Sequence, residues 1–129
     1  MAALWFFVLA TGVRIEVRCK MKRSLSDIEP VVTSHNAGMK RVLLAATESG
    51  CAITQIAITE LRAGEVAKTH IHEDMQEGFY VLKGNLDIVL DGVVDHCQAE
   101  DFVYVKSGAS HELRAVTDVR VMTIGCKTR

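Results

Sequence analysis

From residue 41 onward, the chain is a series of short runs rich in Val, Ile, Thr and Leu, separated by turn residues. Runs of this length and spacing are typical of an all-β sandwich or barrel. No segment carries the sustained 3.6-residue periodicity of an amphipathic helix. We therefore predict an all-β fold. The predicted strands cover residues 41–46, 52–61, 67–72, 78–82, 86–90, 93–97, 102–105, 111–116 and 120–124.

The sharpest local signal is the pair Asp91-Gly92, which separates two of these runs. A two-residue Asp-Gly loop is typical of a type I′ hairpin turn, which needs a positive φ at both central residues. We expect residues 86–90 and 93–97 to form this hairpin.

Composition and charge argue against some classes of binding partner. The chain has 129 residues, a length typical of one domain, and is 49% hydrophobic, enough to bury a core. Its 15 basic and 16 acidic residues give a net charge of −1, which argues against nucleic acid and anionic membranes as partners. The four cysteines have no CxxC spacing. We expect reduced thiols and a cytoplasmic protein.

The N-terminus carries an unbroken apolar run over residues 2–10. A span across a bilayer takes about 20 apolar residues, and a secretory signal begins with basic residues, which this run lacks. Export remains an alternative, and so does a start at Met21, which would make residues 1–20 an upstream extension. We divide the chain into an N-terminal extension and lead-in over residues 1–39, with the only proline, and a barrel domain over residues 40–126.

Two histidines, His70 and His72, are separated by one residue in the predicted strand over 67–72. Side chains at i and i+2 of a strand point to the same face, and neutral imidazole is a good ligand for transition metals. Glu77 opens the next apolar run on the same face as Phe79 and Val81. A core-facing carboxylate is costly unless it is paired, protonated or coordinated, and a shared metal would remove that cost.

Two segments resemble the motifs of the cupin superfamily. Residues 64–84, GEVAKTHIHEDMQEGFYVLKG, resemble its first motif: Gly, five residues, HxH, three or four residues, Glu, six residues, Gly. Residues 100–115, EDFVYVKSGASHELRA, resemble its second motif in part. Gly108 and His111 match there, whereas Glu100, Lys106 and Ala115 replace the motif's glycine, proline and asparagine.

The resemblance implies a double-stranded β-helix, or jelly-roll barrel. It also implies one divalent transition metal (Fe, Mn, Ni or Zn). The implied metal ligands are His70, His72, Glu77 and His111. Alternation along the strand supports only the shared face of the first two, and the resemblance supplies the full set.

Other ionisable residues differ in their expected roles. Lys68 shares the parity of His70, which predicts a cavity-facing ammonium that could anchor an anionic ligand; an outer position with the ammonium in water is the alternative. His35 lies in the lead-in and His96 lies just beyond the Asp91-Gly92 turn. We expect neither histidine to belong to the site.

The ligand set predicts a small metal-binding protein. We expect a metalloenzyme that acts on a small polar, anionic metabolite by Lewis-acid isomerisation or oxygen chemistry. The alternative is a non-catalytic ligand-binding or sensing module. A second acid or base in the cavity would favour the enzyme, and an all-aliphatic cavity would favour the module. The resemblance implies a homodimer, since small cupins are typically dimers. Apolar residues outside the motifs, at 2–10 and 42–44, support this expectation. We predict that an N-terminal strand covers or extends the partner's sheet.

Overall fold

The computed structural model describes residues 4–8, 14–18 and 21–129. This part of the chain is almost entirely β-strand, with one short 3-10 turn at Leu25–Asp27. The strands, in chain order, are β1 (Leu4–Val8), β2 (Arg14–Arg18), β3 (Val31–Val32), β4 (Met39–Ala45), β5 (Ile53–Leu61), β6 (Val66–His70), β7 (Met75–Lys83), β8 (Leu86–Leu90), β9 (Val93–Cys97), β10 (Phe102–Val105), β11 (His111–Ala115) and β12 (Val119–Lys127).

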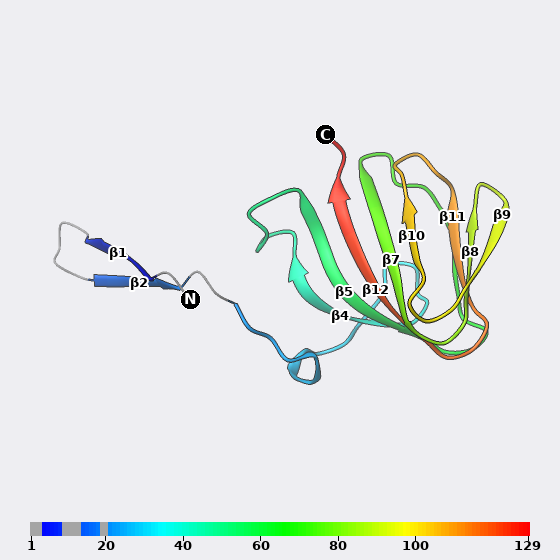
Figure 1. Ribbon diagram of the computed structural model, residues 1–129, viewed down its shortest axis with the longest axis horizontal. Helices are drawn as coiled ribbons and strands as arrows, with labels where there is room; N and C mark the ends of the chain where they lie inside the picture. The colour runs from blue at the N-terminus through cyan, green and yellow to red at the C-terminus, as the bar shows by residue number, and fades with distance from the viewer. Residues whose placement is uncertain (1–3, 9–13, 19–20) are drawn as a thin grey trace.

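Two antiparallel sheets form the barrel, as Figure 1 shows. The six-stranded sheet has the order β10-β7-β12-β5-β4-β3, and the four-stranded sheet has the order β6-β11-β8-β9. Strands close in sequence are often in different sheets, so the chain crosses repeatedly between them. This is the predicted jelly-roll arrangement. β1 and β2 pair only with each other, as an antiparallel hairpin.

The core lies between the two sheets and is mostly aliphatic. On β12, Val119 and Val121 are buried and alternate with exposed or half-buried residues. On β7, Phe79 and Val81 are buried beside Glu77, so the predicted shared face of these three residues is confirmed. The period-2 pattern therefore decides which side chains enter the barrel.

The predicted strands agree closely with the structure. Three of them, over residues 86–90, 93–97 and 102–105, match β8, β9 and β10 residue for residue. The turn between β8 and β9 has φ of 46° at Asp91 and 83° at Gly92, as a type I′ hairpin requires. The largest differences lie at β7 and β12, which extend beyond their predicted ends.

The lead-in contains regular structure for which the sequence analysis predicted no element. It contributes β3, which pairs with β4, and a tight turn over residues 33–38 in which Thr33 Oγ1 donates to the carbonyl of Ala37 at 2.6 Å. Arg23 Nη1 donates to the carboxylate of Glu48 at 2.8 Å. The hydrogen bonds from Arg23 and the Ala45 amide lower the pKa of Glu48 to about 2. The lead-in is thus attached to the barrel through β3, through Arg23 and through the carbonyl of Ile28, which accepts from Nε of Arg41 at 3.1 Å.

Cys51, Cys97 and Cys126, the cysteines that the structure describes, form no disulfide; Cys19 lies outside the described residues. In the described part of the chain, no helix has the length and apolar character to cross a membrane. Of the apolar run over residues 2–10, the structure describes residues 4–8, which form β1.

Candidate metal centre

The end of β6 positions the first two histidines. His70 is the last residue of this strand, and His72 follows in the irregular segment before β7. Their rings lie with centroids 4.9 Å apart. The expectation that these two imidazoles reach the same site is confirmed, although the strand ends two residues earlier than predicted.

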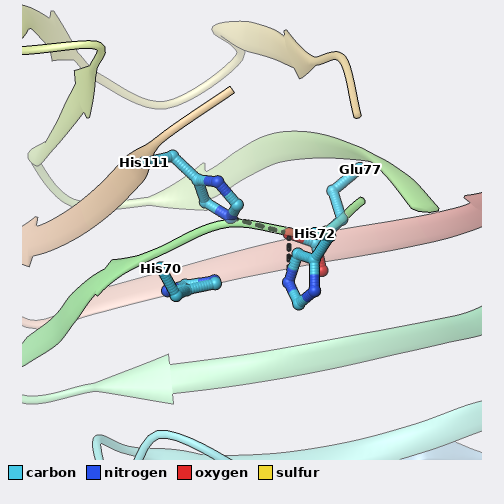
Figure 2. A group of neighbouring side chains, drawn as sticks. All are labelled: His70, His72, Glu77 and His111. Carbon is cyan, nitrogen blue, oxygen red and sulfur yellow. Dashed lines mark hydrogen bonds and ion pairs between the residues drawn. The ribbon is translucent and has the colours of Figure 1, made fainter. Parts of the chain in front are cut away.

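Glu77 approaches the same place from β7. Its side chain is 12% exposed, and one carboxylate oxygen, Oε2, lies 3.1 Å from Nε2 of His111 and 3.6 Å from Nε2 of His72. Figure 2 shows this oxygen between the two rings. The four predicted ligands are therefore brought together, with their donor atoms all within 4.8 Å of one another.

His111 begins β11 and is 1% exposed, which makes it the most buried member of the group. Its ring centroid lies 4.1 Å from that of His70, because residues 111 and 70 are paired across β11 and β6. The four-stranded sheet thus holds two of the imidazoles in register, and the six-stranded sheet supplies the carboxylate.

Backbone carbonyls fix which ring nitrogen of two histidines can bind a metal. Nδ1 of His70 lies 2.7 Å from the carbonyl oxygen of Lys68, and Nδ1 of His111 lies 3.2 Å from that of Ala109. A carbonyl can only accept, so each Nδ1 carries a proton and donates it. Nε2 is left as the metal-binding nitrogen, the arrangement that metal-ligating histidines commonly use.

The electrostatics of the group suit a cation. Burial alone would raise the pKa of Glu77, but the hydrogen bond from His111 and the nearby imidazoles hold it below its ordinary value. Burial would lower the pKa of His111, but the carboxylate of Glu77 and the carbonyl of Ala109 raise it. The buried carboxylate of Glu77 therefore needs positive charge beside it. A metal ion in place of the proton between Glu77 and His111 would supply that charge.

Nε2 of His72 supports the same conclusion. It is the only buried side-chain nitrogen or oxygen in the described part of the chain without a hydrogen-bond partner. Such an atom is costly to bury. Three imidazoles and one carboxylate are a common donor set for divalent transition metals. The residues fit a metal ion.

Lys68 does not face the cavity, and that expectation is wrong. Residue 111 pairs with residue 70, whereas Leu113 pairs with Ala67, so β6 carries a bulge with one extra residue between them. The bulge shifts the alternation: Ala67 is buried and lines the cavity, and Lys68 is exposed. A role for Lys68 in ligand binding stays a prediction without support from the strand geometry.

His35 was wrongly placed away from the site. The turn after β3 brings its ring into a stack with His70, with centroids 3.7 Å apart and planes 23° from parallel. His35 also lines the cavity beside the metal ligands. Burial and the neighbouring histidines lower its pKa. No local pattern in the sequence signals this contact, because it depends on how the lead-in folds over the barrel.

The cavity next to the site has a volume of about 80 Å³. Its lining contains two of the four candidate ligands, His70 and Glu77. The remaining lining residues are Thr33, Ser34, His35, Ala37, Lys40, Gln55, Thr59, Leu61, Ala67, Phe79, Leu113, Val121 and Thr123. Lys40 is a second residue that the sequence analysis missed. It lies one residue before the predicted strand over 41–46, so the sequence analysis assigned it to no face.

The departures from the second motif leave the centre intact. Glu100, in place of a glycine, has φ of 76°, a backbone conformation that glycine adopts more easily. Gly108 donates its amide to the carbonyl of His72 at 2.8 Å and so ties the β10–β11 loop to the site. The backbone of Ala115 bonds to both Gly64 and Glu65. These contacts are made by the main chain and do not depend on the missing motif side chains.

Solved structures share this architecture. A predicted oxalate decarboxylase from Thermotoga maritima is 23% identical, covers 84% of this chain and all of its own, and has a TM-score of 0.77. Ectoine synthase from P. lautus is 18% identical over 83% of this chain and 78% of its own, with a TM-score of 0.71. An RmlC-like cupin from Shewanella frigidimarina is 16% identical over 85% of this chain and 93% of its own, with a TM-score of 0.70.

At these identities the structural likeness establishes the fold. Among curated protein sequences, none matches this chain. The family model of the cupin domain matches residues 57–125, which is more than half of the chain and contains all four candidate ligands. The chain belongs to the cupin family.

Proposed function

We propose that this protein is a metal-dependent enzyme that acts on a small polar metabolite. The observation that carries the proposal is the unpartnered, buried Nε2 of His72 within the group of three imidazoles and one carboxylate. His70 and His111 reinforce it, since a backbone carbonyl engages the Nδ1 proton of each ring and leaves Nε2 as the nitrogen that can bind a metal. The protein thus prepares the donors before a metal arrives.

The number of ligands favours chemistry over a structural role. Four protein donors leave two positions of an octahedral ion open, and open positions distinguish catalytic metals from closed structural ones. A bidentate hydroxy acid, enediol or diketone would fill both. Bound there, the metal would supply Lewis-acid polarisation of the substrate, or oxygen binding if it is iron. The residues around it orient the substrate and exclude water.

The cavity sets the size of the substrate. Its volume of about 80 Å³ is far below the roughly 300–1,000 Å³ of pockets for drug-sized ligands. His70 and Glu77 line it, so a molecule in the cavity is next to the metal ligands. We infer a substrate of a few non-hydrogen atoms.

The cavity content favours an enzyme over a binding module. His35 places an ionisable ring inside the cavity, and imidazole is the side chain most often used to move protons near neutral pH. Lys40, Thr59 and Thr123 make one wall polar. An all-aliphatic cavity would have favoured the non-catalytic alternative, and this cavity is not of that kind.

The test is turnover by the metal-loaded protein. Small hydroxy acids, keto acids and hydroxyaldehydes are incubated with the protein, in air and without oxygen, and followed by proton NMR. We expect at least one to be converted, and we expect His35→Gln to lower the rate while metal content is kept. Binding of these compounds without any conversion would contradict the enzyme and support the sensing module.

The metal that the protein acquires without supplementation separates the two reaction types. Iron together with oxygen-dependent conversion supports oxygen chemistry, whereas zinc with oxygen-independent conversion supports Lewis-acid isomerisation. Glu77→Gln is the matched negative control in both cases. The amide keeps the shape of the side chain and removes its charge, so the metal content of this variant should fall.

A further inference from the structure

One wall of the cavity is polar although it lies on the barrel interior. It is formed by β4, β5 and β12 and carries Lys40, Gln55, Thr59 and Thr123, which we call the polar wall. Thr59 is directly opposite Lys40 in the pairing of β4 with β5. Thr123 is opposite residue 57 on β5, which makes it a diagonal neighbour of Thr59. The four side chains thus form one continuous surface.

The two threonines have unused hydrogen-bonding capacity. Thr59 is 9% exposed and Thr123 is 8% exposed. Across the residues that the structure describes, the side-chain hydrogen bonds include none made by either hydroxyl. The interior positions two residues before Thr59 and Thr123 hold Ala57 and Val121, which are buried without any polar group. Hydroxyls that line a cavity and bond to no protein group indicate a polar ligand.

Lys40 brings a positive charge to the same wall. Its Nζ donates to Oε1 of Gln55 at 2.6 Å, which holds the ammonium in place. An ammonium has three N–H donors, so two remain for a ligand. No ion pair within the described part of the chain includes Lys40, and the only carboxylate that lines the cavity, Glu77, belongs to the metal centre.

We propose that the polar wall is an anion-binding subsite, in which Lys40 and the hydroxyls of Thr59 and Thr123 bind a carboxylate of the substrate. The substrate class is a small organic acid that has a second oxygen group for the metal centre. Three neutral imidazoles, one carboxylate, a divalent ion and Lys40 sum to a charge of +2, which an anionic substrate offsets. This inference builds on the proposed function and replaces Lys68 with Lys40 as the anion anchor.

Malonate is a suitable probe, because it offers one carboxylate to the metal centre and a second to the polar wall. It is titrated by calorimetry into the metal-loaded wild type, Lys40→Met and Lys68→Met. We expect Lys40→Met to weaken binding by about tenfold or more, the usual scale of a lost charge-assisted hydrogen bond. Lys68→Met is the matched control, since this lysine lies outside the cavity, and its affinity should equal that of the wild type.

Two further variants protect the test against a simple folding defect. Lys40→Arg keeps the charge and should retain most of the affinity, whereas Thr59→Val keeps the shape and should weaken binding through the lost hydroxyl. Equal malonate affinity in wild type and Lys40→Met would overturn the proposal. So would a wild type that does not bind malonate.

The same titration with metal-stripped protein separates this inference from the proposed function. If binding to the stripped protein still depends on Lys40, the anion subsite stands whatever the metal does. If the protein never acquires metal and malonate binding still depends on Lys40, the metal-dependent function fails while the subsite is supported.

Discussion

At the scale of single residues, main-chain groups make many of the hydrogen bonds that position the candidate metal ligands. The carbonyls of Lys68 and Ala109 orient His70 and His111, and the amide of Gly108 bonds to the carbonyl of His72. Among the residues that depart from the second cupin motif, Ala115 contributes through its backbone, which bonds to Gly64 and Glu65. A site built in this way tolerates changes in side chains as long as the backbone conformation is kept.

Glu100 is the departure with an energetic consequence. Its φ of 76° lies in the left-handed region, which costs an L-residue roughly 1–2 kcal/mol and a glycine much less. We predict that Glu100→Gly raises the free energy of unfolding by about 1 kcal/mol, since part of the gain is lost to the greater entropy of the unfolded chain. Urea denaturation measures the change. Glu29→Gly, an exposed position without a positive φ, should give no gain, and equal effects in both variants would contradict this explanation.

At the scale of elements, the turns decide how the sheets meet. Gly84, the last glycine of the first motif, has φ of 87°, and a Cβ there would overlap the backbone oxygen of Asp118. Gly64, the first glycine of that motif, has φ of 88° and open space around it. Two glycines of one motif thus differ in whether the surrounding structure leaves room for a side chain.

We predict that Gly84→Ala destabilises the protein by more than about 3 kcal/mol, because both backbone strain and a main-chain clash must be relieved. Gly64→Ala should cost only about 1–2 kcal/mol, the cost of its backbone conformation alone. Thermal or urea unfolding of the two variants checks this difference. Similar losses in both would show that the contact with Asp118 does not limit the β7–β8 turn.

The elements also show what sequence could predict. Strand positions followed from local alternation and turn residues, so β8, β9 and β10 matched their predicted bounds. The resemblance to the first cupin motif identified His70, His72 and Glu77, and the resemblance to the second identified His111. Lys68 was misplaced because a bulge arises from the pairing of two strands and leaves no mark on one of them. His35 was missed because its contact with His70 joins segments 35 residues apart through a turn whose path depends on the finished barrel.

At the scale of the whole molecule, the barrel leaves an apolar edge. β3 is the outer strand of the six-stranded sheet, and Val31, Val32 and Met39 beside it are 47%, 56% and 40% exposed. Such an edge can pair with another chain. The homodimer proposal assigns this role to an N-terminal strand of the partner.

We predict a dimer mass by light scattering throughout the micromolar range, because covering the edge removes apolar surface from water. A variant that begins at Met21 should dissociate at higher concentrations than the full chain, and Val32→Lys should do the same. A monomer mass for the full chain across that range would reject the proposal.

The central claim is that His70, His72, Glu77 and His111 hold one metal ion, and elemental analysis of protein purified without added metal tests it most directly. We expect bound metal in the wild type and in His96→Ala, since the His96 side chain is 80% exposed and pairs with Asp87 away from the site. His70→Ala and His72→Ala should lower the metal content sharply, because the loss of one ligand weakens affinity more than the 10–100-fold typical of outer-shell changes. Glu77→Gln should lower it as well. Equal metal content in the wild type and in all of these variants would contradict the account.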